Sequence, residues 1–156
     1  MDGSRKTSGL YRNHYRYFYN FCILKISNPT KLNITTLQYV FGTVEIYDNY
    51  LITIMHEGIT VIPEYNKDLL EISKTYFKNR PFGYISYRKN SYAVDPRVYI
   101  ETSKIENLMA FAVVSTHEIN ISNVEIEKIF LKKPFHLFDA LSEAKAWVDK
   151  MVNEAD

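Results

Sequence analysis

The fold of this chain is decided by the stretch Phe82-Gly83-Tyr84-Ile85-Ser86-Tyr87-Arg88-Lys89-Asn90-Ser91-Tyr92-Ala93-Val94-Asp95-Pro96. Its first six residues are mostly apolar and aromatic, which predicts a strand over 82–87. Asn90-Ser91 is typical of a turn. Asp95-Pro96 indicates a helix start, because an aspartate can cap free backbone N–H groups and proline already has a helical φ. We therefore predict a strand, a polar loop and a helix. Arg88, Asn90 and Ser91 would lie at the carboxyl end of the strand, where open α/β sheets bind their ligands.

The composition is that of an ordinary globular protein of one domain. The chain has 156 residues, of which 46% are hydrophobic and 24% charged. It contains 13 Tyr and 9 Phe, an excess that fits either plain strand residues or a contact surface. Cys22 is the one cysteine, so no intramolecular disulfide can form, and a reducing, cytoplasmic location is expected.

The sequence gives little support for catalysis. Its histidines are scattered, without the spacing of a metal site, and it lacks a nucleophile elbow, a phosphate-binding glycine loop and a pair of carboxylates at catalytic spacing. We therefore expect no metal, no cofactor and no enzymatic activity.

The N-terminal residues 1–34 differ from the rest in charge. They contain six basic side chains and one acidic side chain, a net charge of +5, whereas the remainder has 13 basic and 17 acidic side chains, a net charge of −4. The uncharged run 17–24 is far too short to span a membrane, and no signal-peptide cleavage site follows it. Three interpretations stay open: a disordered or non-native extension, an extra strand or helix on the domain, or a basic-aromatic arm that touches membrane or nucleic acid. For the chain as a whole no nucleic-acid partner is expected.

The remaining chain alternates strands and helices. A strand over 36–47 and a second over 50–56 are expected to form an antiparallel hairpin, with Gly42 marking a bulge or a close backbone approach. Further elements are expected as a helix over 63–78, the strand 82–87, a helix over 96–107, a buried strand over 108–115, a helix opened by the Ser122-x-x-Glu125 capping box, a strand over 135–138 and a last helix capped by Asp139. The predicted order is β-β-α-β-α-β-α-β-α, an α/β fold with a mixed sheet covered by helices.

Two parts of the sequence resemble a known family. Residues 135–148, Phe-His-Leu-Phe-Asp-Ala-Leu-Ser-Glu-Ala-Lys-Ala-Trp-Val, resemble the C-terminal signature of SpoIIAA-like, STAS-type proteins. The stretch 56–59 (His-Glu-Gly-Ile) and the block from Gly83 to Pro96 are similar to a small flavobacterial group of STAS-like proteins. The resemblance covers about 35–153. It implies a SpoIIAA-like (STAS-like) domain over 35–156, preceded by the extension 1–34.

The resemblance also implies a function. STAS-type proteins are non-enzymatic regulatory modules that bind a partner protein, often a kinase or an anti-sigma-type regulator. They are switched by phosphorylation of a Ser or Thr at the start of the helix after the central strand. Ser91 is the counterpart by position, although Asn-Ser-Tyr-Ala-Val-Asp-Pro stands where the family has a D-S-[ST]-G-like turn. Related folds also hold lipids or small apolar ligands, and the sequence leaves open whether the chain forms a homodimer.

Five residues form the predicted partner- or ligand-binding site: Arg88, Asn90, Ser91, Tyr92 and Asp95. Arg88 could bind an anionic group, with Asn90 and Ser91 fixing the loop or the ligand. In the alternative, Arg88 pairs with a nearby acid such as Asp95, and Asn90 and Ser91 bond to their own backbone. A cavity between sheet and helices would favour a ligand carrier, whereas a tight core with an exposed apolar patch would favour a protein-binding module.

Overall fold

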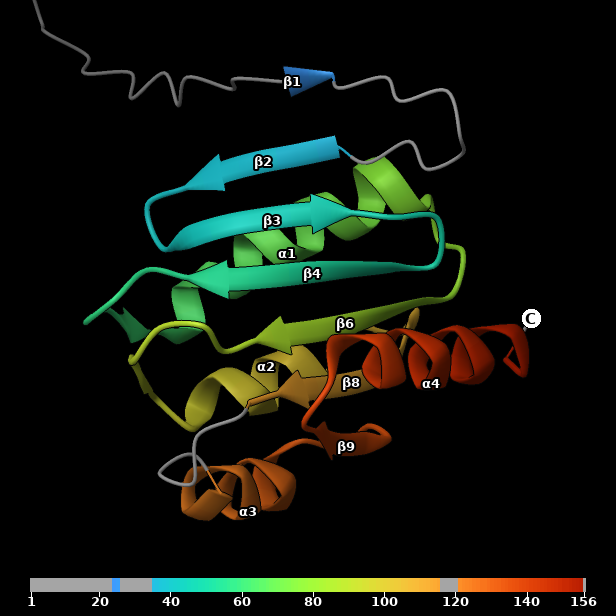
Figure 1. Ribbon diagram of the computed structural model, residues 1–156. Coiled ribbons are helices and arrows are strands. Elements are labelled where there is room, and N and C mark those ends of the chain that lie inside the picture. Colours follow the sequence, from blue (N-terminus) through green and yellow to red (C-terminus); the bar gives the residue numbers. More distant parts are fainter. Residues whose placement is uncertain (1–23, 26–34, 116–120, 156) are drawn as a thin grey trace, which may run out of the picture.

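The computed structural model describes residues 24–25, 35–115 and 121–155, with the backbone alone at 24–25 and 121–124 (Figure 1). Among these residues, seven strands form one mixed sheet in the order β1-β2-β3-β4-β6-β8-β9. The strands are β1 (Leu24–Lys25), β2 (Thr35–Tyr39), β3 (Gly42–Ile46), β4 (Tyr50–Met55), β6 (Phe82–Tyr87), β8 (Leu108–Val114) and β9 (Phe135–Phe138). Strands β1 to β4 pair antiparallel, and β4, β6, β8 and β9 pair parallel. Two short strands, β5 (Thr60–Val61) and β7 (Ala93–Val94), form a separate parallel pair.

Helices cover both faces of the sheet. They are α1 (Asn66–Ile72), which is preceded by a 3-10 turn at Pro63–Tyr65 and followed by a π-helical turn at Ser73–Phe77, then α2 (Arg97–Ser103), α3 (Ile121–Phe130) and α4 (Leu141–Asn153). One core cluster joins a face of the sheet to α1 and α2, and a second joins the other face to α4. Figure 1 shows α4 crossing in front of β6 and β8, with α1 behind β3 and β4.

The central strand β6 is buried on both faces because it lies between the two helical layers, with β4 and β8 as its neighbours in the sheet. Phe82 and Tyr84 belong to the cluster with α1 and α2, and Ile85 belongs to the cluster with α4. This alternation is the two-residue period of a strand. The predicted strand 82–87 and the predicted mixed sheet covered by helices are confirmed. From α1 onward, the strands of the main sheet alternate with the helices as predicted.

The predicted strand 36–47 is wrong, because the chain reverses at Val40-Phe41 and forms the two strands β2 and β3. Gly42 permits the reversal: its φ is 151°, a value that side chains with a Cβ rarely adopt. The predicted close backbone approach is confirmed, since a Cβ at Gly42 would lie 2.2 Å from the carbonyl oxygen of Ile54.

Two helix boundaries also differ from the predictions. The helix expected over 96–107 ends at Ser103, after which the chain turns and buries Ile105. The predicted Asp139 cap is wrong: Ala140 occupies the N-cap position in an extended conformation, and no side chain caps the helix. The side chain of Ser122 in the predicted capping box lies outside the described residues.

Residues 24–25 are the described part of the predicted extension. They pair with β2 as the short strand β1, Leu24 opposite Thr36 and Lys25 opposite Thr35. The boundary between an extension 1–34 and a domain 35–156 stays a prediction. In the described part of the chain, no helix is long and apolar enough to cross a membrane.

Candidate binding site

The loop after β6 is fixed against the end of the β3–β4 hairpin. The Asn90 side chain donates a hydrogen bond of 2.6 Å to the carbonyl oxygen of Met55. The backbone N–H of Ser91 donates to the carboxylate of Glu57 over 2.8 Å, and Gly58 N–H donates to the Ser91 carbonyl over 2.7 Å. The partners of Asn90 and Ser91 therefore belong to the neighbouring hairpin, and the β5–β7 pair continues the same contact.

Arg88 points into the protein and not toward solvent. Its guanidinium forms an ion pair with the carboxylate of Glu127 on α3, and each side chain is only 4% exposed. Arg88 Nε and Glu127 Oε2 are buried and have no hydrogen-bond partner among the described residues. Burial alone would lower the pKa of Arg88, but Tyr92 and Glu127 beside it raise that pKa overall. Arg88 does pair with an acidic side chain, as the alternative interpretation expected, but that acid is Glu127 and not Asp95.

Asp95 instead opens α2. Its carboxylate accepts hydrogen bonds of 3.0 Å from the backbone N–H and the side-chain Nε of Arg97. These bonds, with the Arg97 charge, lower the pKa of Asp95. Ser91 is exposed, but it precedes β7 and so lies well before the start of α2. Its phosphorylation stays a prediction.

A layer of tyrosines surrounds the buried ion pair. The Arg88 guanidinium carbon lies 5.6 Å from the ring centroid of Tyr92, within the range of a cation–π contact. The hydroxyls of Tyr92 and Ser86 lie 3.0 Å apart, within hydrogen-bond distance. Burial raises the pKa of Tyr99 well above its usual value, and the neighbouring Glu127 carboxylate raises it further. The residues around the ion pair come from three parts of the chain: Ser86 from β6, Tyr92 from the loop and Tyr99 from α2.

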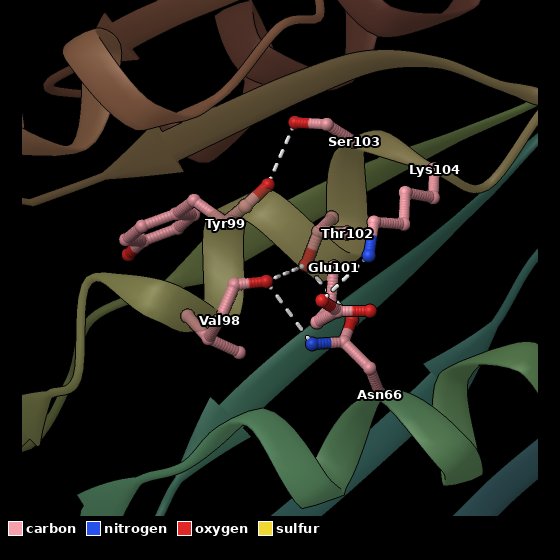
Figure 2. A network of polar contacts seen from close by, with 7 residues as sticks. All are labelled: Asn66, Val98, Tyr99, Glu101, Thr102, Ser103 and Lys104. Carbon is pink, nitrogen blue, oxygen red and sulfur yellow. Dashed lines mark hydrogen bonds and ion pairs between the residues drawn. The ribbon is translucent and has the colours of Figure 1, made fainter.

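A second polar network joins α1 to α2 (Figure 2). The Asn66 amide donates to the carbonyl oxygen of Val98 over 3.1 Å. The Thr102 hydroxyl donates to Asn66 Oδ1 over 2.8 Å and lies 2.9 Å from the Val98 carbonyl oxygen. All these groups are buried, so each bond replaces a lost bond to water. The network fixes α2, the helix that follows the site loop, against α1.

A small cavity lies between these two helices and the sheet. Its volume is about 60 Å³. Aromatic and aliphatic side chains and a few hydroxyl groups line it: Phe41, Val44, Leu51, Thr53, Met55, Val61, Tyr65, Asn66, Leu69, Ile72, Tyr84, Ser86, Tyr92, Val94, Val98, Tyr99, Thr102 and Phe111. Sites for drug-sized ligands have volumes of roughly 300–1,000 Å³, so this cavity is too small for a lipid.

Three large apolar side chains are exposed on α2 and α3. Ile100 is 43% exposed, Ile126 is 46% exposed and Ile129 is 66% exposed. The two helices are in contact, and the Ser103 hydroxyl at the end of α2 accepts a hydrogen bond of 2.8 Å from Lys132 N–H just after α3. The helix after the central strand and its neighbour thus present apolar groups to solvent.

The structure brings Arg88 and Tyr92 together inside the protein, binds Asn90 to the carbonyl oxygen of Met55, and leaves Ser91 on the surface. The sequence analysis missed Glu127, Tyr99 and Ser86. A signal for Glu127 was present, because it stands on the same helical face as Val124 and Leu131, and a charge on an apolar face indicates a buried partner. No group of three or more His, Cys, Asp or Glu within the described ranges is placed to hold a metal ion.

Comparisons with known proteins add the following. No protein-family model matches the chain, and no curated protein matches its sequence. The structure is similar to the crystal structure of an uncharacterized protein from the DUF3478 family, with a SpoIIAA-like fold, from Shewanella loihica. The similarity covers 79% of this chain and 98% of that chain, with 13% identity and a TM-score of 0.44. At this level it carries no information on function. The structure itself shows an α/β domain with a mixed sheet between helices, with the predicted alternation of strands and helices from α1 onward.

Proposed function

We propose that this chain is a non-enzymatic regulatory module that binds a partner protein through the outer faces of α2 and α3. The observation that carries the proposal is the exposure of Ile100, Ile126 and Ile129 on these two contacting helices. Exposed apolar groups that gather on one surface mark interaction sites, whereas those scattered singly do not.

The exposed isoleucines share their helices with charged side chains, as the apolar centre and the polar rim of a protein interface do. Charged side chains of both signs are exposed on the same two helices and at the C-cap of α2: Arg97, Glu101, Lys104, Glu125 and Lys128. Protein interfaces combine an apolar centre with a polar, solvent-accessible rim. A partner that fits would present an apolar patch with charges at its edge. The family resemblance suggests a kinase or an anti-sigma-type regulator as the class of partner.

The size and the lining of the cavity favour a protein-binding module over a lipid carrier. The cavity has the expected place and lining for a carrier, between helices and sheet and among Tyr and Phe, but its volume is only about 60 Å³. The polar side chains around it are bonded to one another, as in the Thr53–Tyr84 pair at 2.9 Å. We therefore assign the cavity no role in holding a lipid.

The test is a capture experiment from host lysate with the full chain and two variants. Ile100→Asp/Ile129→Asp places one charge on the exposed part of each of the two helices. Val40→Asp is the matched control, since Val40 is 67% exposed in the β2–β3 turn, at the opposite edge of the sheet from α3 (Figure 1). Circular dichroism establishes that both variants fold.

We expect one protein to be captured by the wild type and by Val40→Asp and to be lost from Ile100→Asp/Ile129→Asp. Capture that is equal in all three would contradict the proposed surface. Co-purification of a lipid with all three, and of no protein, would contradict the protein-binding role itself.

A further inference from the structure

We propose that Arg88 is the binding group of a second, internal site for a small organic carboxylate, and that Glu127 occupies this site in the unliganded protein. The site lies inside the fold, between β6, the following loop and α3, and it is separate from the proposed docking surface. Arg88 stands at the carboxyl end of the central strand, the edge of the sheet where α/β proteins bind ligands.

The ion pair between Arg88 and Glu127 leaves hydrogen bonds unmade. A guanidinium has five N–H donors, and its strongest contact with a carboxylate uses two parallel bonds. Here the bond between Arg88 Nη2 and Glu127 Oε1 is formed, while Arg88 Nε and Glu127 Oε2 are buried without a partner among the described residues. Buried polar atoms without a partner are rare in folded proteins. Glu127 thus fills the site incompletely, and a free carboxylate can adopt the two-bond geometry that a helix-bound side chain does not.

Two side chains that line the cavity also lie beside the ion pair, whereas Arg88 and Glu127 are not themselves part of the lining. Tyr92 lines the cavity and lies against the Arg88 guanidinium. Tyr99 lines the same cavity, and the Glu127 carboxylate near it raises the pKa of its hydroxyl. A ligand with its carboxylate on Arg88 would therefore direct its apolar part past these two tyrosines into the cavity.

The volume limits the size of the ligand. A cavity of roughly 150 Å³ holds benzene, and this one has about 60 Å³. The site therefore fits a short aliphatic monocarboxylate such as propionate and excludes fatty acids. Because Glu127 belongs to α3, binding requires that its side chain leave Arg88, and the ligand and Glu127 compete for the same guanidinium.

The experiment titrates the ¹⁵N-labelled full chain with propionate and follows the Nε–Hε resonance of Arg88 by NMR. Propionamide, which has the same shape and no charge, is the ligand control. Glu127→Gln keeps the size of the side chain and removes the competing charge. Arg97→Gln is the matched protein control, because Arg97 forms an exposed ion pair with Asp95 away from the cavity.

We expect propionate, and not propionamide, to shift the Arg88 resonance with saturation in the wild type. Glu127→Gln should bind propionate about tenfold more tightly or better, and Arg97→Gln should bind it as the wild type does. Absence of a shift in the wild type, equal shifts with propionamide, or no gain in Glu127→Gln would each overturn the proposal. If Glu127→Gln does not fold, the wild-type titration against propionamide decides alone.

Discussion

At the scale of single residues, the Arg88–Glu127 pair makes the firmest prediction about stability. Both side chains are 4% exposed, so removal of one leaves the other charge buried and unpaired. Arg88→Met or Glu127→Leu alone should lower the free energy of unfolding by about 3–5 kcal/mol, whereas the double variant should stay close to the wild type. Urea unfolding of the four proteins gives the coupling energy. If the losses in unfolding free energy of the two single variants simply add in the double variant, the two charges are not energetically coupled.

Gly42 offers a second test at this scale, with Gly58 as its control. Both residues have a positive φ, 151° and 74°, but a Cβ would contact backbone atoms of β4 only at Gly42. Nothing lies within 4 Å of a Cβ at Gly58. Gly58→Ala should therefore lower the free energy of unfolding only by the backbone contribution, about 1 kcal/mol. Gly42→Ala should lower it at least about twice as much. Equal losses in thermal or urea unfolding would contradict the close approach of β3 and β4.

At the scale of elements, α4 packs on β6 at a distance that only glycine allows. A Cβ at Gly83 would lie 2.1 Å from Cγ1 of Val148. Gly83→Ala should cost about 1–3 kcal/mol through overpacking, and Val148→Ala should be destabilising because it leaves a cavity. In Gly83→Ala/Val148→Ala the new methyl group fills space that Val148 vacates, so the loss should be smaller than the sum. A loss equal to the sum would mean that α4 does not rest on Gly83.

The elements that the sequence predicted well are those with long, regular patterns. The apolar run 108–115 and the stripe Leu141, Ala144 and Val148 each specify one element without reference to the rest of the chain. The turn at Val40-Phe41 was missed because it lacks the Asn, Asp or Pro that usually mark a turn. Strands β5 and β7 are too short for any pattern and exist only because the loop after β6 meets the hairpin.

The sequence predicted where along the chain the candidate site lies, but not which residues its side chains contact. A strand, a polar loop and a capped helix locate Arg88, Asn90 and Ser91 along the chain, and local rules supply all three elements. The partners of these residues come from far away in sequence: Glu127 for Arg88, Met55 for Asn90 and Glu57 for Ser91. Which charge a buried arginine meets depends on how α3 is placed, and no local pattern contains that information.

At the scale of the whole molecule, partly buried tyrosines make the free energy of unfolding depend on pH in the alkaline range. Burial, with help from nearby carboxylates, raises the pKa of both Tyr39 and Tyr50 from 10.0 to about 12. Above pH 10 the unfolded chain loses these protons while the folded chain keeps them, so stability is complete below pH 10 and falls as the pH rises toward 12. Urea unfolding between pH 8 and 11.5 should show this decline, and Tyr50→Phe should make it less steep. Stability that is flat over this range would contradict the burial of these hydroxyls.

Binding of a partner protein through the outer faces of α2 and α3 can be tested by site-specific photo-crosslinking in the native host. A photoreactive amino acid replaces Ile100 or Ile129 in the full chain, or Val40 as the control, since all three side chains are exposed. We predict that positions 100 and 129 both crosslink to the same protein and that position 40 does not. Crosslinks from position 40 to that protein, or none from positions 100 and 129, would contradict the proposed binding surface.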